Sequence, residues 1–413
     1  MPKSKLRIWI IISTINSDAL EHLKKAFSLF KSKNSIEIQV EFVTWERVFT
    51  ALVEDFKNGT GPDVIQLGTS WISTFAHMGY LDKVPEYIDV KSSINPGINN
   101  LCKYEGELHA LPWLVDTIIM AGHKDYMSNL GISKSDVKDW RGFKKVLKNI
   151  IEHKKSNSNI PNPLSIAFNV DRDSMQRFFS ILWSKGWEFP NIEKKGVEIL
   201  TDPFVLDTIS YFADLKMTCN IDQDWMKHPY QVNEDFYLHG LSLFYIGSWN
   251  GIVNSIKCKE NKNQGPKEFC VLPFPSSDKK SSPYGGGSVL AVSSKSKEKT
   301  AAWSLVDFIL SDEFISKWTY EMGNISAFKD EFWQKRVFDE RIQLMYEQTV
   351  NSKVFPAHPA WITIEKQIIQ GLGHAIVDLL KKRDSSINDK IYSNLKKTDL
   401  KVQEIVKMSW EAR

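Results

Sequence analysis

Most of the motifs that would assign a chemistry to this 413-residue chain are missing from it. The first apolar segment is followed by residues 13–17, which lack the Gly-x-Gly-x-x-Gly turn of a dinucleotide site. No Gly-x4-Gly-Lys-Ser/Thr loop is present to hold a nucleoside triphosphate. The nine histidines occur singly, without a His-Glu-x-x-His motif or the Cys/His spacing of a zinc site. These absences predict a protein that uses no cofactor and no metal.

Cysteine is scarce as well, and its spacing indicates no redox or metal motif. The four cysteines are Cys102, Cys219, Cys258 and Cys270, and none belongs to a Cys-x-x-Cys pair. Cys258 and Cys270 are close enough in sequence to bridge, but an even count decides nothing by itself. We expect buried free thiols, which leaves the redox compartment open.

Apolar runs long enough to enter a membrane are also absent. No run approaches the ~20 apolar residues that a transmembrane helix requires. Near the N-terminus, three basic residues precede an apolar run at 8–12, which is shorter than the ~7–15 residues of a signal-peptide core. We interpret residues 6–12 as a buried strand, so either a signal segment has been removed or the protein is not exported.

The charge balance argues against a nucleic-acid partner. Fifty-three basic residues face 50 acidic ones, a formal net charge of +3. Basic pairs such as Lys194-Lys195 lie scattered among polar and acidic neighbours, as solvated helix faces do, and they form no stripe that could follow phosphates. With 42% hydrophobic and 25% charged residues, the chain reads as a soluble protein of two domains, and we expect a monomer.

Hydrophobic periodicity predicts an α/β fold that begins with a parallel sheet. Apolar residues are continuous at 6–12 and alternate with polar ones at 36–42, as in strands. A helix pattern at 20–30 and a strongly amphipathic one at 45–56 separate these strands from a third at 64–67. The order β-α-β-α-β implies parallel strands with right-handed crossovers. Further helices are predicted at 133–153, 174–187, 203–217, 299–310 and 361–380, and further strands at 240–246, 269–272 and 289–292.

Tryptophan is the abundant chemical signal, with 14 residues. Four of them lie beside turn-forming residues and outside the helical stripes: Trp71, Trp113, Trp249 and Trp361. An aromatic ring can cover the apolar face of a sugar, while carboxylates, amides and backbone groups bind its hydroxyls. Core packing is the alternative for each ring. Trp45 and Trp303, which lie on amphipathic helices, are expected in the core.

Trp249 carries the sharpest expectation of ligand contact. It follows a predicted strand, where open α/β sheets place ligands, and we expect the glycines at 247 and 251 to leave its ring exposed. The same segment resembles a nucleophile elbow, but the central residue is Trp249 where that elbow needs serine. Asp116, three residues after Trp113, is a second contact candidate, with a structural hydrogen bond as its alternative. No carboxylate pair stands out as glycosidase machinery, so no catalytic residue is assigned.

Several segments, in this order, resemble the extracellular solute-binding proteins of ABC importers, in particular the sugar-binding group that includes maltose-binding protein. The matching runs are GPDVI at 61–65, WISTFAHMGYL at 71–81, YEGELHALP at 104–112, YIGSW at 245–249 and GGGSVLAV at 285–292. A departure occurs at 323–327, where Ile325-Ser326 stands in place of the family's usual proline.

The resemblance implies a two-lobe, type II periplasmic-binding-protein-like fold. Each lobe would be a central sheet flanked by helices, with the ligand in a cleft between lobes that close by hinge motion. The N-terminal lobe would hold residues 1–112 and 284–325, and the C-terminal lobe residues 113–283 and 326–413. Matching positions make Trp249, Asp116 and the Gly286 backbone the first expected contacts. The further expected contacts are Ser70, Trp71, Trp113, Asn250 and Trp361.

The function implied by the resemblance is non-catalytic binding of a mono- or oligosaccharide for delivery to ABC-transporter permease subunits. Such a protein would work in the periplasm or at the cell surface. A glycoside-processing enzyme and a ligand-sensing module on the same fold remain the alternatives. Ligand identity does not follow from the fold.

Overall fold

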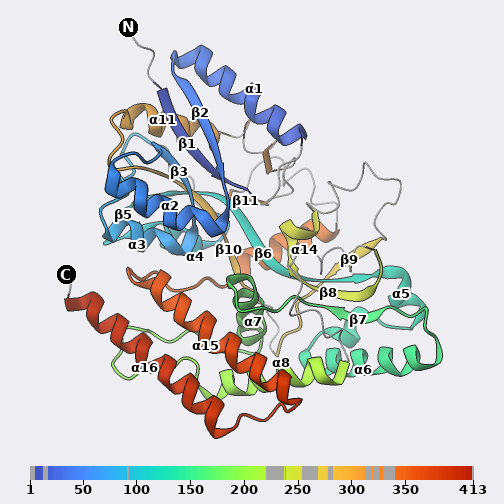
Figure 1. Cartoon of the computed structure of the whole chain (residues 1–413). Coiled ribbons are helices and arrows are strands. Elements are labelled where there is room, and N and C mark those ends of the chain that lie inside the picture. Colours follow the sequence, from blue (N-terminus) through green and yellow to red (C-terminus); the bar gives the residue numbers. More distant parts are fainter. Residues whose placement is uncertain are drawn as a thin grey trace. The chain divides into compact units, whose positions relative to one another are not determined.

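The protein folds into two compact units, described here from a computed structural model (Figure 1). The structure describes residues 5–12, 17–90, 93–219, 237, 239–253, 268–277, 282–311, 314, 318–319, 325–328 and 340–411. Unit 1 comprises Met1–Asp116, Gly286–Phe338 and Val354–Trp361, and unit 2 comprises Thr117–Gly285, Asp339–Lys353 and Ile362–Arg413. In the described part of the chain, no helix is both long and apolar enough to cross a membrane.

Unit 1 is built on the parallel sheet that the periodicity predicts. Strands β1 (Lys5–Ile11), β2 (Glu37–Val43) and β3 (Val64–Gly68) pair in parallel in the order β2-β1-β3. Their crossover helices are α1 (Ser17–Asn34) and α2 (Trp45–Asn58). β10 (Gly285–Val292) adds to β3 in antiparallel register. The smaller elements are η1 (Thr69–Trp71), α3 (Ile72–His77), α4 (Pro96–Leu101), β4 (Lys103–Tyr104), β5 (Glu107–Leu108), α11 (Lys299–Ile309) and β11 (Ile325–Ser326).

Helix α2 shows how local chemistry sets the ends of an element. Its apolar stripe buries Val48, Leu52 and Phe56 at 0%, 0% and 4% exposure. Gly59 ends the helix in the left-handed region, at φ 68°, where its N–H reaches the last-turn carbonyls. Glycine is favoured there because it adopts this conformation without strain.

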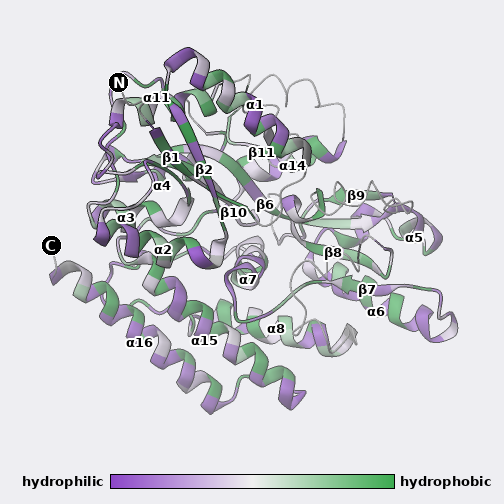
Figure 2. Cartoon of the chain, turned by 45° about the horizontal axis from the view of Figure 1, so that its top comes forward, coloured by the Kyte–Doolittle hydropathy of each residue, from purple (hydrophilic) through white to green (hydrophobic). Residues whose placement is uncertain are grey.

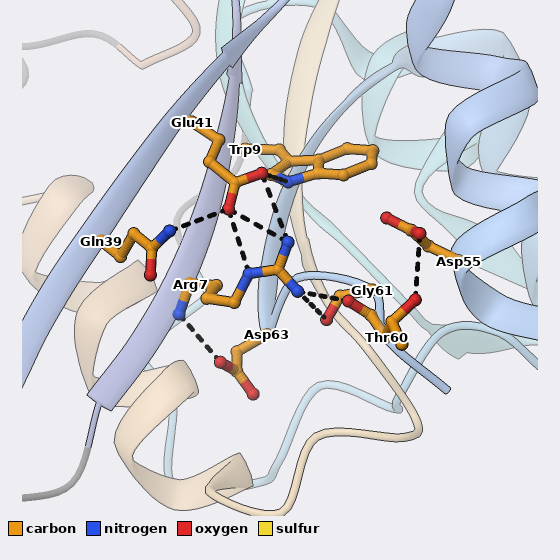
Figure 3. A network of polar contacts seen from close by, with 8 residues as sticks. All are labelled: Arg7, Trp9, Gln39, Glu41, Asp55, Thr60, Gly61 and Asp63. Carbon is orange, nitrogen blue, oxygen red and sulfur yellow. Dashed lines mark hydrogen bonds and ion pairs between the residues drawn. The ribbon is translucent and has the colours of Figure 1, made fainter. Parts of the chain in front are cut away.

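A polar network fixes the amino-terminal edge of this sheet (Figure 3). Arg7 donates to both carboxylate oxygens of Glu41 at 3.1 and 3.3 Å and to the carbonyl of Thr60. The backbone N–H of Arg7 donates to Asp63 Oδ2 at 2.9 Å, and Asp63 N donates back to the carbonyl of Arg7 at 2.9 Å. The hydroxyl of Ser296 donates to Asp63 Oδ1 at 2.6 Å. Asp63, part of the GPDVI motif, therefore joins β1, β3 and the segment after β10.

Unit 2 is centred on the long strand β6 (Leu111–His123), which begins in unit 1. β8 (Ser242–Ser248) pairs antiparallel with β6 and parallel with β7 (Asn162–Ser165), and β9 (Phe269–Leu272) also pairs with β6. The helices are α5 (Lys124–Asn129), η2 (Lys134–Val137), α6 (Trp140–Ser156), α7 (Arg172–Ser184), α8 (Pro203–Cys219), α14 (Glu340–Asn351), α15 (Trp361–Lys382) and α16 (Asp389–Glu411).

The helix predicted at 133–153 is two elements. Ser133 and Asp136 form a capping box around η2, and the Asp139 side chain accepts a hydrogen bond from Gly142 N at the start of α6. Two capping carboxylates within seven residues each favour a new helix start, so the chain breaks between them. The helices predicted at 174–187, 203–217, 299–310 and 361–380 are confirmed as α7, α8, α11 and α15.

A buried carboxylate holds the last helix, α16, to residues 199–201. In Figure 2, α15 and α16 carry alternating hydrophobic and hydrophilic bands. Asp399 of α16 is 1% exposed. It accepts hydrogen bonds from the backbone N–H groups of residues 199–201 at 2.9–3.1 Å and from the Thr201 hydroxyl at 2.7 Å. Four donors compensate the cost of burying this carboxylate.

Two of the four cysteines can be assigned. Cys102 and Cys270 are buried free thiols, as expected. Burial raises the pKa of the Cys270 thiol, so this cysteine stays protonated more readily than an exposed one. The side chains of Cys219 and Cys258 lie outside the described residues.

Candidate functional site

Several predicted site residues of unit 1 meet at the carboxyl edge of its parallel strands. Ser70 and Trp71 directly follow β3, and Gly286 lies at the start of the neighbouring strand β10. The last β3–β10 pair joins Gly68 and Ser288. The chain then turns into η1, so Ser70 lies two residues after this pair and Gly286 two residues before it, both at the same edge of the sheet. Open α/β sheets place ligands at this edge.

A buried glutamine holds the strand ends together behind this edge. Gln66 is 4% exposed. Its amide donates to Ser288 Oγ at 2.9 Å, and its carbonyl oxygen accepts from the backbone N–H of Ile11 at 2.8 Å. One side chain thereby connects the carboxyl end of β1 to β3 and β10, which fixes the spacing of the residues that follow.

Within the glycine triplet at 285–287, Gly287 has a clear structural reason. Its φ of 140° lies in the region that favours glycine, and an added Cβ would lie 2.0 Å from the carbonyl oxygen of Leu114. β10 therefore approaches β6 more closely than any side chain at Gly287 would allow. Asp116, half-buried, follows two residues after Leu114. The close approach brings Asp116 and Gly286 onto neighbouring strands.

Two tryptophans of unit 1, Trp71 and Trp45, differ in solvent exposure from what the sequence predicts. Trp71 is 2% exposed, with its ring centroid 5.8 Å from that of Trp45 and 6.1 Å from that of Phe49. Trp45 was expected in the core, but it is half-buried. The helical pattern predicts the α2 stripe correctly, but Trp45 is the first residue of the helix and lies at the end of edge strand β2. Its position at a strand end was the available signal.

Two further predicted contacts of unit 1 lie in aromatic packing. Trp113 is 0% exposed and stacks on Trp318, with centroids 6.0 Å apart and an angle of 14°. Trp361 is also 0% exposed and stacks on Phe355 at 5.4 Å and 26°. Their roles as ligand contacts stay predictions.

In unit 2, Trp249 and Asn250 begin a helical turn directly after β8. Ser248, at the end of β8, accepts a hydrogen bond from Gly251 N through its Oγ at 3.2 Å and so caps that turn. Trp249 is 8% exposed and Asn250 is half-buried. The segment is therefore a capped strand-to-helix turn.

The expectation that flanking glycines expose Trp249 is wrong. A Cβ on Gly247 would lie 2.1 Å from the hydroxyl oxygen of Tyr245. Tyr245 is 1% exposed, and its hydroxyl donates to the Ser248 carbonyl at 3.3 Å. Gly247 thus makes room for a buried tyrosine, and the Trp249 indole is buried despite the flanking glycines.

Tyr284 is an aromatic residue of unit 2 that the sequence reasoning did not select. It is half-buried, and its ring stacks on Trp183 with centroids 6.4 Å apart and an angle of 15°. Its N–H donates to Ser180 Oγ at 2.8 Å, and its carbonyl accepts from Thr117 Oγ1 at 3.0 Å. The signal was an aromatic residue next to the glycine triplet.

A charged pair joins two helices of unit 2. Arg172, the first residue of α7, donates from Nε and Nη2 to Oε2 of Glu365 in α15 at 3.1 and 2.8 Å. The Glu365 side chain is 2% exposed, and its other oxygen has no hydrogen-bond partner. Such a carboxylate oxygen can accept a hydroxyl donor. Within the described residues, no group of three or more His, Cys, Asp or Glu side chains is arranged to hold a metal ion.

Comparison with known proteins gives a consistent result. The model of the family described as bacterial extracellular solute-binding protein matches residues 25–335. The maltotriose-binding protein of Pyrococcus abyssi is 22% identical over 363 residues, covering 84% of this chain and 74% of that protein. The diacetylchitobiose-binding protein DasA of Streptomyces coelicolor is 23% identical over 317 residues, covering 75% and 70%.

Solved structures with the same fold cover nearly the whole chain. An ABC-transporter solute-binding protein of Thermotoga lettingae bound with α-D-tagatose gives a TM-score of 0.79 at 18% identity, covering 98% of this chain and 100% of that one. Maltose-bound MalE3 of T. maritima gives 0.78 at 17% identity, covering 97% and 99%. The predicted α/β, periplasmic-binding-protein-like fold class is confirmed.

Proposed function

Because this chain belongs to the bacterial extracellular solute-binding protein family, we propose that it binds a mono- or oligosaccharide without altering it and delivers it to the permease subunits of an ABC transporter. The observation that carries the proposal is the carboxyl edge of the unit 1 sheet. Three half-buried residues lie there on separate elements: Trp45 on α2, Ser70 on η1 and Asp116 on β6. Two of the relatives bind oligosaccharides by their names, maltotriose and diacetylchitobiose.

The chemistry of this edge suits a neutral sugar. A pyranose ring presents an apolar C–H face, which an indole can cover, and a rim of hydroxyls. Ser70 can both donate and accept a hydrogen bond, and Asp116 can accept from two hydroxyls. The backbone at Gly286 adds polar groups without a side chain in the way. An apolar surface with a few placed polar groups is the usual composition of a small-molecule site.

The proposal also covers partner, place and oligomeric state. Delivery to a permease places the protein in the periplasm or on the outer cell surface, and a monomer suffices for that role. The competing functions are a glycoside-processing enzyme, which needs two carboxylates about 5–10 Å apart at the scissile bond, and a ligand-sensing module. Size-exclusion chromatography with light scattering tests the monomer.

The experiment is a thermal-shift screen of the full chain against maltose, maltotriose, diacetylchitobiose and tagatose, with amino acids and polyamines as controls. A ligand that binds only the folded state stabilises it by about 2.7 kcal/mol at a hundredfold excess over Kd, so a clear rise in Tm is expected for one class of sugar. Chromatography of the same mixtures should recover the sugar unchanged. Absence of any shift with sugars contradicts the carbohydrate proposal, and a hydrolysis product contradicts the non-catalytic one.

A further inference from the structure

We propose that Trp45 is the aromatic residue of unit 1 that stacks on the bound sugar, and that Trp71 is the positioning residue that holds it. This inference rests on the proposed function and assigns one side chain within it. It reverses the prediction made from the sequence, in which Trp71 is a ligand contact and Trp45 is a core residue.

Exposure separates Trp45 from the other tryptophans. Among the tryptophan side chains that the structure describes, Trp45 alone is not buried. The others in unit 1 are at most 4% exposed, and those in unit 2 are at most 8% exposed. A stacking platform must offer a ring face to the ligand, and within the described set this condition selects Trp45.

The place of Trp45 in the fold explains its exposure. It is the first residue of α2, two positions after the end of β2, and β2 is the edge strand of the sheet. Helical side chains point back toward the N-terminus of their helix. The Trp45 indole therefore leans past the start of α2, toward the ends of the parallel strands, while Val48 and Leu52 face the core at 0% exposure.

Trp71 fixes the orientation of the Trp45 ring. The two indole planes meet at 80°, an edge-to-face arrangement with centroids 5.8 Å apart. This geometry leaves at least one face of Trp45 uncovered by Trp71. Phe49, one turn after Trp45, contacts the same Trp71 ring at 69°. Trp71 thus holds the first turn of α2 at two points.

Both indoles lie beside Gly68, the last residue of β3. An added Cβ there would lie 3.4 Å from Trp45 Cζ3 and 3.7 Å from Trp71 Cδ2. Ser70 follows two residues later. The Trp45 ring and the Ser70 hydroxyl therefore both lie near the end of β3, although Trp45 itself follows β2. A ring that is already held in place loses little side-chain entropy on binding.

The test measures Kd by isothermal titration calorimetry with maltotriose, or with diacetylchitobiose if maltotriose does not bind. Trp45→Ala should weaken binding by at least about thirtyfold, the size of an aromatic hot spot. Trp45→Phe, which keeps a smaller ring, should lose less. Trp303→Phe is the matched control, because it alters a buried tryptophan of unit 1 on α11, and it should lower Tm while leaving Kd within about twofold.

Fluorescence distinguishes a positioning role for Trp71 from simple packing. Sugar binding should change the tryptophan emission of the wild type and of Trp71→Phe, but much less that of Trp45→Phe. Trp71→Phe should weaken binding, whereas a residue that only packs would lower Tm at constant Kd. If the wild type binds and Trp45→Ala binds within about twofold of it, the inference is overturned. If the wild type binds no sugar, it is the proposed function that fails.

Discussion

At the scale of single residues, Asp399 shows how one buried carboxylate can hold separate segments together. It lies on α16 and receives all its hydrogen bonds from residues 199–201, about two hundred positions earlier in the chain. Both carboxylate oxygens are used. All four donors are on residues 199–201, so this one side chain ties the middle of α16 to that segment.

Asp399→Asn is expected to destabilise the protein by about 1.5–3 kcal/mol, because an amide NH₂ would face backbone donors where an oxygen now accepts. The measurement is urea unfolding followed by circular dichroism. Glu404→Gln, an exposed change on the same helix, is the control and should stay within about 0.5 kcal/mol. Equal midpoints for the two variants would contradict the role of Asp399.

His109 predicts a pH dependence of stability. Burial lowers its pKa, against smaller raising effects from hydrogen bonds to the backbone of Leu81 and Asp82. Its Nδ1 is buried and has no hydrogen-bond partner. The unfolded chain therefore takes up the proton first, and stability is lost as the pH falls below about 6.5, the ordinary histidine pKa.

The check on His109 is the Tm difference between pH 8 and pH 5. His109→Gln should reduce the loss of Tm on acidification, because the amide keeps a donor and does not titrate. His153→Gln, an exposed change on α6, should leave the loss as in the wild type. A wild-type pH profile in His109→Gln would exclude His109 as its source.

The candidate site could be predicted at this scale in part. Periodicity placed Ser70 and Trp71 just after the third strand, because strand ends can be predicted from alternation and apolar runs. Gly286 was selected by the family resemblance alone, and Asp116 by that resemblance and its place near Trp113. Exposure could not be read in the same way. Gly247 beside Trp249 serves the Tyr245 hydroxyl, and the helical stripe of α2 does not reveal that Trp45 leans beyond the helix start.

At the scale of elements, the contact between β10 and β6 depends on one glycine. Gly287→Ala should cost about 2–6 kcal/mol, from about 1–3 for the unfavourable φ and about 1–3 for overpacking against the Leu114 carbonyl. Gly59→Ala is the matched control, since its φ is also positive but nothing lies within 4 Å of an added Cβ. It should cost only about 1–2 kcal/mol.

Thermal unfolding of the two glycine variants, compared with the wild type, separates conformational strain from steric conflict. A Gly287→Ala loss no larger than that of Gly59→Ala would mean that the strands can move apart at little cost. The expected larger loss would support close strand contact as the reason for the glycine at this position.

Helices and strands with uninterrupted apolar patterns could be predicted from the sequence. Helix α16 could not, because its apolar pattern is interrupted. Its buried face holds Ile391, Leu395, Val402 and Val406, at most 6% exposed. Asp399, at 1% exposure, lies in the middle of this stripe. A charged residue at the centre of an apolar face breaks the pattern that signals an amphipathic helix, so no helix was predicted at 389–411.

At the scale of the whole molecule, the near balance of charge suits a neutral ligand. The formal net charge is +3 from 53 basic and 50 acidic residues. Affinity for a neutral sugar should change less than about twofold between about 50 and 500 mM salt, because no counterions are released on binding. Titration at both salt concentrations is the measurement. A steep loss of affinity would indicate a charged ligand instead.

The pairing of β3 has a consequence for synthesis on the ribosome. β3 ends at Gly68, but its neighbour β10 begins only at Gly285. Translation proceeds at roughly 5–20 residues per second, so the edge of β3 that pairs with β10 stays unpaired for some 10–40 s. An unpaired buried strand is a template for pairing with other chains. The nascent chain must therefore be shielded from its neighbours during this interval, well before any sugar is encountered.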